Sequence, residues 1–445
     1  MALQNTNNTE NAGQATQQEI IVGLDIGTSK VCALVAAKDS TPNTIKILGL
    51  GIADSDGLSH GVVVNIEKTV KSIQKVLEQA EQQSGHKITE VIISITGKHI
   101  QPSSTKGIIA VPSHTHDITL ADVNRVIEEC RNIKIPSELR ILHVIPQDFI
   151  IDGQSGILDP VGMNGVRLEA NALIVTAQDT AMHNLHRCIE RLGLKVKNII
   201  FKPLASSYAV LDEEEKEVGV ALVDIGGGTC DIAIYEENCI RYTASIAMAG
   251  KQVTDDIRKV LGIIANQAER IKKEYGYAYR ESIMQDEVLM IPGIAGRKPL
   301  EIQKSELSGI IQSTMTEIFE LALQEFRNSG YSGSLGAGVV LTGGCSLIRG
   351  IDELAQDVFG MPVKIGFPSS IEYSGLAPEI KNPIYSTAVG LVMFGLEGLM
   401  DDNDIMEDAD EDRSIGDSYS QEKKNESGEQ NTSFWSKIKD KLSQL

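Results

Sequence analysis

Two segments of this chain place an aspartate, glycines and hydroxyl side chains at the end of an apolar run. The first reads GLDIGTSK over residues 23–30 and the second reads LVDIGGGTCD over residues 222–231. A further apolar run follows each, so each segment predicts a β-hairpin whose glycines supply the positive φ of the turn. Backbone N–H groups and hydroxyls in such turns can hold phosphate oxygens. Because each half of the chain has one copy, we expect a duplicated fold that closes on one nucleotide.

The aspartate of each segment, Asp25 or Asp224, stands at a strand end, where its carboxylate can hold a hydrated Mg²⁺. The candidate phosphate-binding residues are the glycines, hydroxyls and lysine of the two turns: Gly27, Thr28, Ser29, Lys30, Gly226, Gly227, Gly228 and Thr229. A single D-x-G hairpin is also a common structural turn, so the prediction depends on the two copies together.

Length and composition narrow the class of protein. A chain of 445 residues exceeds what one hydrophobic core usually spans, so several domains are expected. The formal net charge of −20 excludes a general nucleic-acid binder, which needs a basic surface. The six cysteines contain no C-x-x-C pair and are interpreted as small core residues of a protein in a reducing cytosol.

The order of predicted elements supports two halves with an insertion. Residues 20–96 read as three strands, a helix over 66–82 and a further strand. Residues 97–177 change to short strands around a helix that begins near Thr119, which indicates a small α+β subdomain. The second half restarts at Val218 and contains a long helix over about 304–328 and a last core helix over about 386–396.

The two ends of the sequence differ from the body. Residues 1–19, rich in Asn, Thr and Gln, predict a disordered tail with neither a signal peptide nor a membrane span. Residues 398–432 are acidic and polar and predict a flexible linker. Residues 433–445 have helical periodicity, with apolar Phe434, Trp435, Ile438, Leu442 and Leu445 gathered on one side and basic Lys437, Lys439 and Lys441 around them. This pattern favours an anchor on an anionic membrane surface; the alternative is a helix that docks on a partner or on the body.

Five segments together resemble the actin-like ATPase superfamily, which includes actin, Hsp70 and sugar kinases. They are the two hairpins, the Gly343-Gly344 turn, and connecting helices near 203–211 and 385–396. The resemblance implies an α/β, actin-like two-lobed ATPase fold that clamps ATP and Mg²⁺ between the lobes. It further implies that Gly343, Gly344 and Ser346 contact the adenosine, and that Glu269 and Lys272 bracket the ribose.

Within this superfamily the chain is similar to the FtsA family of bacterial cell-division proteins. The similarity rests on residues 21–30, on PLASSY over 203–208, on LTGG over 341–344, on GRKP over 296–299 and on the amphipathic end. It implies subdomain 1A over 20–96 and 178–210, 1C over 97–177, 2A over 211–257 and 315–397, and 2B over 258–314.

The family resemblance also implies a role. An ATP-binding, polymer-forming subunit would tether the tubulin-like FtsZ ring to the inner face of the cytoplasmic membrane during septum formation. The FtsZ C-terminal peptide would dock in 2B, where Arg297 could pair with its acidic groups, unless Arg297 is an ordinary exposed charge. Subdomain 1C would face later division proteins or a neighbouring subunit.

One residue departs from the superfamily pattern. Many ATP-hydrolysing relatives carry an acidic residue before the proline of the first connecting helix, where this chain has Lys202. Since lysine is a poor base near neutral pH, we expect at most a weak ATPase, unless Lys202 faces solvent.

Two other classes of protein compete with this interpretation. A soluble small-molecule kinase of the same superfamily has no use for a lipid-binding helix, and a chaperone-like ATPase needs a substrate-binding β domain where this chain has an acidic linker. The fold alone does not separate the three classes.

Overall fold

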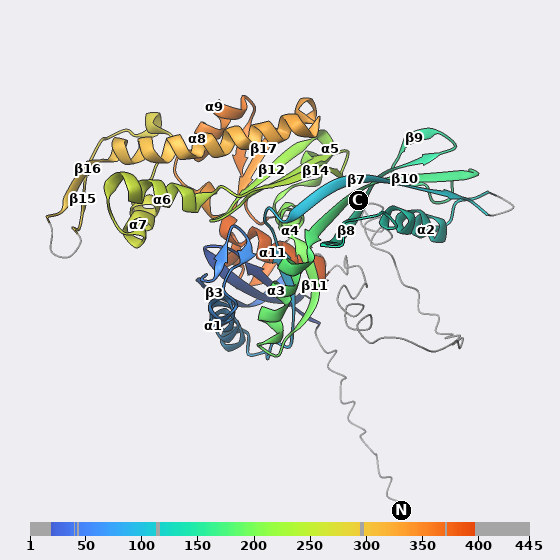
Figure 1. Ribbon diagram of the computed structural model, residues 1–445, viewed down its shortest axis with the longest axis horizontal. Coiled ribbons are helices and arrows are strands. Elements are labelled where there is room, and N and C mark those ends of the chain that lie inside the picture. The colour runs from blue at the N-terminus through green and yellow to red at the C-terminus, as the bar shows by residue number, and fades with distance from the viewer. Residues whose placement is uncertain are drawn as a thin grey trace, which may run out of the picture.

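The computed structural model describes residues 19–39, 41, 44–112, 116–293, 298–369 and 372–396. They form two large lobes, one above the other in Figure 1, and a third, smaller sheet that extends to one side. Arg297, residues 1–18, the predicted linker and the predicted membrane helix lie outside the described residues. Among the described helices, none combines the length and the apolar character that a membrane span requires.

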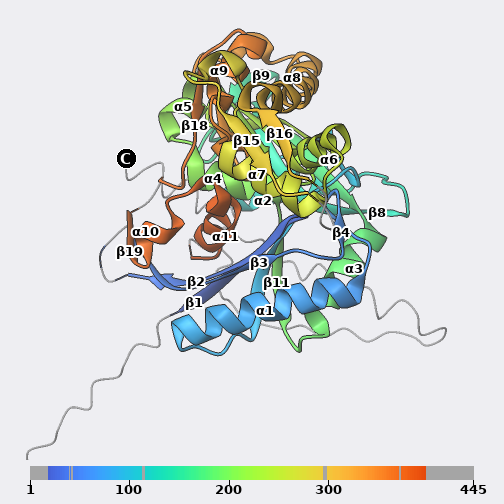
Figure 2. The same ribbon diagram turned by 90° about the vertical axis from the view of Figure 1, so that its left-hand side faces the viewer.

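The first lobe is built on a six-stranded sheet in the order β11-β6-β1-β2-β3-β19. The strands are β1 (Ile20–Ile26), β2 (Lys30–Lys38), β3 (Thr44–Asp54), β6 (Glu90–Ile95), β11 (Lys195–Phe201) and β19 (Glu372–Gly375). Helices α1 (Ile66–Ser84) and α3 (Asp179–Glu190) lie on one face, and α4 (Lys202–Val210) and α11 (Ser386–Leu396) lie on the side facing the second lobe (Figure 2). Because helices cover both faces, the strands are continuous apolar runs.

The second lobe is built on a five-stranded sheet in the order β14-β13-β12-β17-β18. The strands are β12 (Val220–Ile225), β13 (Cys230–Glu236), β14 (Cys239–Ile246), β17 (Val339–Thr342) and β18 (Val363–Ile365). Its helices are α5 (Glu213–Val218), α6 (Gly250–Leu261), α7 (Ala265–Tyr275), α8 (Lys304–Ser329) and α9 (Ile351–Phe359), and a small hairpin pairs β15 (Val288–Ile291) with β16 (Leu300–Gln303).

The two large sheets repeat one topology. In the first, β1, β2 and β3 form an antiparallel meander, and β6 pairs parallel to β1. In the second, β12, β13 and β14 form the same meander, and β17 pairs parallel to β12. Each predicted phosphate hairpin is therefore the first turn of its sheet, which confirms the expected duplication.

The third sheet confirms the predicted insertion. Its order is β7-β10-β8-β9, with strands β7 (Ile100–Ala110), β8 (Leu139–Ile151), β9 (Gln154–Ile157) and β10 (Arg167–Gln178). Helix α2 (Leu120–Arg131) packs on this sheet and begins at the predicted cap, where Thr119 and Asp122 form a capping box. The sheet has its own hydrophobic core.

The end of the described chain corrects one expected boundary. We expected residues 315–397 to belong to the second lobe, but β19 pairs parallel to β3 and α11 packs against β1, β2 and α4. The chain thus returns to the first lobe after β18, through β19, α10 (Ala377–Ile380) and α11. In the second lobe, α6 and α7 are separated at Gly262, whose φ is 64°. The first lobe also has a small hairpin, β4 (Leu58–Ser59) with β5 (Val62–Val63).

Candidate nucleotide-binding site

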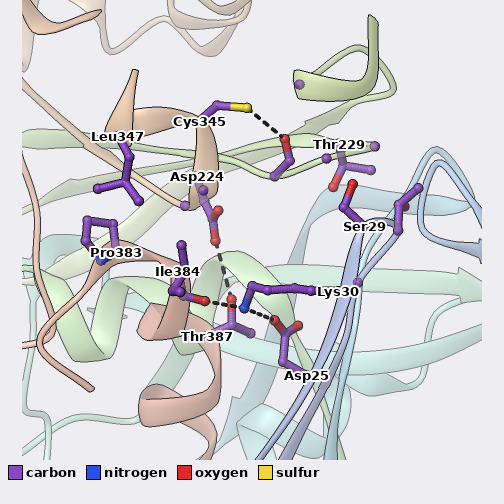
Figure 3. Close-up of a pocket in the computed structure, with 18 of the residues that line it drawn as sticks. Asp25, Ser29, Lys30, Asp224, Thr229, Cys345, Leu347, Pro383, Ile384 and Thr387 are labelled. Atoms are coloured by element: carbon purple, nitrogen blue, oxygen red, sulfur yellow. Dashed lines mark hydrogen bonds and ion pairs between the residues drawn. The ribbon is translucent and has the colours of Figure 1, made fainter. Parts of the chain in front are cut away.

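A cavity of about 820 Å³ lies between the two lobes and is lined by residues of both (Figure 3). Ten charged side chains line it: the bases Lys30, Lys75, Lys202, Lys272, Lys273 and Arg349, and the acids Asp25, Asp54, Asp224 and Glu269. The lining is therefore net basic in a chain whose formal net charge is −20. This excess of basic groups favours an anionic ligand.

The two hairpin turns face each other across this cavity. Each is closed by a backbone hydrogen bond, from the N–H of Gly27 to the carbonyl of Lys30 at 3.0 Å in one, and between the corresponding residues Gly226 and Thr229 at 2.9 Å in the other. A Cβ added to Gly227 would lie 1.9 Å from Oγ of Ser29. Gly27, Gly226, Gly227 and Gly228 do not have the positive φ expected for these turns. Gly227 is instead required by the close approach of the lobes, and both turns line one shared cavity.

Asp25 lies at the floor of the first half of the site. Its Oδ1 accepts a hydrogen bond from the hydroxyl of Ser94 at 2.8 Å. Its Oδ2 lies 3.6 Å from Nζ of Lys30 (Figure 3). Lys30 also donates to the carbonyl of Ile384 and lies 5.6 Å from the ring centre of Tyr385. The lysine of the first turn thus links the first hairpin to the segment before α11.

Asp224 occupies the equivalent position in the second half. Its Oδ2 accepts from the hydroxyls of Ser206 at 2.6 Å and Thr387 at 3.5 Å, and lies 3.6 Å from Nζ of Lys202. Its Oδ1 is buried with no partner among the described residues. A buried carboxylate oxygen without a donor is costly, so this atom is suited to receive a ligand or a hydrated cation.

Lys202 is buried and faces the cavity, so the alternative in which it faces solvent is wrong. Burial alone would lower the pKa of its ammonium, but the carboxylates of Asp224, Asp25 and Asp231 raise it above the ordinary lysine value. The lysine therefore stays charged and cannot serve as a base near neutral pH.

Asp231 forms a hydrogen-bonded link between the lobes. Its carboxylate accepts from Thr229 at 2.9 Å and Ser245 at 2.6 Å in its own lobe, and from Thr96 of the first lobe. Burial raises the pKa of Asp231, against the opposing attraction of Lys202. Thr96 also lines the cavity, so this contact closes the wall of the site.

The predicted ribose pair lines the cavity from α7. Glu269 Oε2 lies 2.6 Å from Nζ of Lys272, and that ammonium also donates to the carbonyl of Gly250 and to Thr254, both at 2.9 Å. Burial alone would raise the pKa of Glu269, but Lys272 and a hydrogen bond from Thr254 lower it overall. Glu269 is held as well, by Lys272 and Thr254 through Oε2 and by Lys273 at 3.2 Å through Oε1, so both residues of the predicted pair already have partners at the cavity wall.

The Gly343-Gly344 turn closes the other side of the cavity. Gly343 has φ 84° and ψ 175°, a conformation suited to glycine. Apolar Leu347, Pro383 and Ile384 line this part of the cavity (Figure 3). Together with Ile348, which also lines the cavity, they offer a surface for a flat aromatic base. Ser346 is not among the cavity-lining residues; its hydroxyl donates to the carbonyl of Gly343 at 2.7 Å and holds the turn.

Several polar residues of the site were not predicted from the sequence: Ser94, Thr96, Ser206, Asp231 and Thr387. Ser94 and Ser206 each donate to one hairpin aspartate from an otherwise apolar or small-residue segment. In the sequence, Ser94 stands out only as a hydroxyl in a buried strand, and Ser206 only as a hydroxyl in a helix of small residues. Neither feature identifies the aspartate that the hydroxyl contacts.

A hydrated magnesium ion with ATP fits these residues. The two hairpin turns offer backbone N–H groups. Asp25 and Asp224 lie near the ends of β1 and β12 and both line the cavity, and Oδ1 of Asp224 is unpaired among the described residues. The described residues hold no group of three or more His, Cys, Asp or Glu side chains placed to bind a bare metal ion. A magnesium ion that keeps several waters and uses one or two carboxylates with phosphates does not need one.

Comparison with known proteins agrees with this geometry. The profile of the family "Cell division protein FtsA" matches residues 221–390, and that of the "SHS2 domain inserted in FTSA" matches residues 97–176. Among solved structures, the fold is similar to a chain of the PilM-PilN type IV pilus biogenesis complex (TM-score 0.60, 16% identity, 84% of this chain and 98% of that one). It is also similar to MreB5 of Spiroplasma citri bound to ADP (TM-score 0.52, 19% identity, 84% and 95%). These similarities confirm the actin-like fold.

Sequence relatives cover most of the chain. The cell division protein FtsA of Pseudomonas aeruginosa is 44% identical over 85% of this chain and 90% of its own length. Those of Escherichia coli K12 and Bacillus subtilis are 40% and 37% identical, over 86% and 84% of this chain and 92% and 83% of their own lengths. The chain belongs to the FtsA family of cell-division proteins.

Proposed function

We propose that this chain is an ATP-binding, polymer-forming subunit that tethers the FtsZ ring to the inner face of the cytoplasmic membrane at the division site. The observation that carries the proposal is the pair of facing hairpin turns around one net-basic cavity, in a chain of the FtsA family. The kinase alternative is not favoured, because the sequence relatives are cell-division proteins.

The chain's own residues account for nucleotide binding between the lobes. The hairpin N–H groups and Thr28, Ser29 and Thr229 would hold the phosphate oxygens, and Asp25 and Asp224 would hold the waters of a magnesium ion. When bound, that ion neutralises part of the phosphate charge. Because the hairpins belong to different lobes, a ligand that touches both stabilises the closed arrangement.

Movement of one lobe relative to the other would change the contact between α4 and α11. A Cβ at Gly390 of α11 would lie 1.8 Å from the carbonyl oxygen of Ala205 in α4, so the two helices touch through their backbones. Ser206 and Thr387, one from each helix, also meet at 3.0 Å beside Asp224. A nucleotide that moves Asp224 therefore acts on the helix crossing, which offers a route from the site to polymer contacts.

Hydrolysis is expected to be slow. Lys202 occupies the start of α4, where ATP-hydrolysing relatives carry an acidic residue, and its ammonium is held by Asp224. A charged lysine favours phosphate binding but does not take a proton from water. The proposal therefore gives ATP mainly a structural role.

Membrane attachment is assigned to residues 433–445. Each of the three lysines contributes about 1 kcal/mol near an anionic leaflet, and the apolar face adds several more, less the cost of ordering the helix. One such helix binds reversibly, whereas many on one polymer bind by avidity. As a flexible linker, residues 398–432 would have an r.m.s. reach of roughly 30 Å and would leave the body free to pack into a filament.

Partner binding is assigned to two surfaces. The β15–β16 hairpin exposes apolar Val288, Met290 and Leu300, and Arg297 falls between these two strands in the sequence. Apolar and basic residues together would suit an amphipathic acidic peptide such as the FtsZ C-terminus. The inserted subdomain over 97–177 would meet later division proteins or a second copy of this chain.

Liposome co-sedimentation tests the proposal. The full chain and a truncation after Thr432 are each sedimented with anionic vesicles, with and without ATP. A variant with Ile438→Asp serves as a matched control because it keeps the length and all lysines. ATP-enhanced binding that both changes abolish supports the tethered polymer. If all three forms stay in the supernatant while ATP still binds, the membrane proposal is wrong.

A further inference from the structure

Lys272 of α7 lies at the wall of the nucleotide cavity, and only 7% of its side chain is exposed. Its Nζ lies 2.9 Å from the carbonyl oxygen of Gly250, 2.9 Å from the hydroxyl oxygen of Thr254 and 2.6 Å from Oε2 of Glu269. An ammonium group has three N–H donors. Each of the three has an acceptor within the chain, so none remains for a sugar hydroxyl.

Gly250, the first residue of α6, connects this lysine to the second phosphate turn. Its carbonyl accepts from Lys272, and its N–H donates to the carbonyl of Gly226 at 3.1 Å. The next residue, Lys251, donates its backbone N–H to the carbonyl of Gly227 at 2.7 Å. The start of α6 therefore holds two consecutive residues of the turn, and Lys272 holds the start of α6.

The surroundings of Gly250 leave it little room to move. A Cβ built on Gly250 would lie 2.2 Å from Sγ of Cys345, 3.2 Å from the carbonyl oxygen of Gly226 and 3.6 Å from Nζ of Lys272. The thiol of Cys345 also donates to the carbonyl of Gly226 at 3.4 Å. Because these segments are in direct contact, a displacement of Gly250 would displace the second phosphate turn as well.

We propose that Lys272 is a positioning residue for the second phosphate turn, which acts through Gly250 and thereby supports binding of the nucleotide phosphates instead of contacting the ribose. This inference rests on the proposed nucleotide-binding function. It differs from the sugar contact that the family resemblance implies for this lysine. The remaining alternative is that Lys272 only joins α7 to α6 and supports the lobe as a whole.

Calorimetric titrations with three ligands in excess Mg²⁺ separate these roles: ATP, 2′,3′-dideoxy-ATP and adenosine, the last measured by competition with ATP. The full chain is compared with its Lys272→Met variant. The variant should lose about ten- to hundredfold in affinity for ATP, the value of one hydrogen bond to a charged group. The same factor should appear with 2′,3′-dideoxy-ATP, whereas the affinity for adenosine should stay within about threefold of the wild type. Lys259→Met, which removes an exposed lysine of α6, should follow the wild type with all three ligands.

The other patterns overturn the inference. A loss with ATP that disappears with 2′,3′-dideoxy-ATP would assign Lys272 to the ribose. An equal loss with all three ligands would leave it a general structural role, and an unchanged affinity for ATP would leave it no role in binding.

Circular dichroism reports whether Lys272→Met is folded. If it is not, Thr254→Val takes its place, because this change removes one of the three acceptors of Lys272. A smaller loss with the same dependence on the ligand is then expected, and either of the other patterns refutes the inference. If the wild type binds no ATP in Mg²⁺, the proposed nucleotide function itself fails, whereas an overturning pattern among the variants leaves that function intact.

Discussion

The substitution Gly343→Ala should disrupt the site, whereas Gly344→Ala at the next position should not. A Cβ at Gly343 would lie 2.4 Å from Oδ1 of Asp224 and 2.7 Å from the carbonyl oxygen of Ile225. At Gly344 the nearest atom would be Cγ2 of Ile384 at 3.8 Å, an ordinary contact. The pair thus compares the same chemical change at adjacent residues.

The expected loss of folding free energy in Gly343→Ala has two causes, the backbone conformation at this position and the crowding of the added Cβ. Gly343 combines φ 84° with ψ 175°, a region that costs other residues about 1–3 kcal/mol. Overpacking against the Ile225 backbone adds about 1–3 kcal/mol. The displaced atom is the unpaired oxygen of Asp224, so ATP affinity should fall together with stability.

Urea unfolding without nucleotide and calorimetric ATP titration measure the two effects. Gly343→Ala should lose about 2–6 kcal/mol of stability and at least tenfold in ATP affinity. Gly344→Ala should stay within about 1 kcal/mol and threefold of the wild type. Equal behaviour of the two variants would refute the assigned geometry of this turn.

Three further predictions concern other parts of the chain. Gly390→Ala should lower the thermal midpoint by several degrees, because its Cβ would meet the α4 backbone at 1.8 Å; an unchanged midpoint would contradict the tight α4–α11 crossing. Burial lowers the pKa of His143, which accepts the N–H of Phe201, to about 4, so the unfolded chain binds the extra proton first and stability should fall by about 2 kcal/mol from pH 7 to pH 5. Urea unfolding of His143→Gln should lack that share of the loss, and an identical pH dependence would refute it. Arg297→Ala should weaken binding of a fluorescent FtsZ C-terminal peptide about tenfold, measured by anisotropy, while Lys298→Ala serves as the neighbouring control; equal effects would contradict the assigned role.

Local signals in the sequence predicted many elements of the fold. Helix α11 is an apolar run, and helix α1 ends at Gly85, so nearby residues define both helices. Their observed bounds lie close to the predicted ones. The capping box at Thr119 is similarly local. The hairpins were predictable because their turns need glycine in a short, repeated pattern.

Contacts between distant segments were not predictable in the same way. β19 pairs with β3 although more than three hundred residues separate them, and a short strand does not specify a parallel partner. The ion pair of Lys202 with Asp224 joins the start of α4 to the end of β12, two segments that the sequence does not place together. The hydrogen bond from Thr96 to Asp231 forms only when the two lobes meet, so neither residue identifies it alone.

We propose above all that the cavity between the lobes binds ATP through both hairpins. The most direct test is calorimetric titration of the full chain with ATP and Mg²⁺, compared with Gly228→Val, whose Cβ would lie 2.3 Å from Oγ1 of Thr28 in the facing turn. We expect that the wild type binds one ATP per chain and that the variant binds ATP with at least tenfold lower affinity. Undetectable binding by the wild type, or equal affinity in the variant, would contradict it.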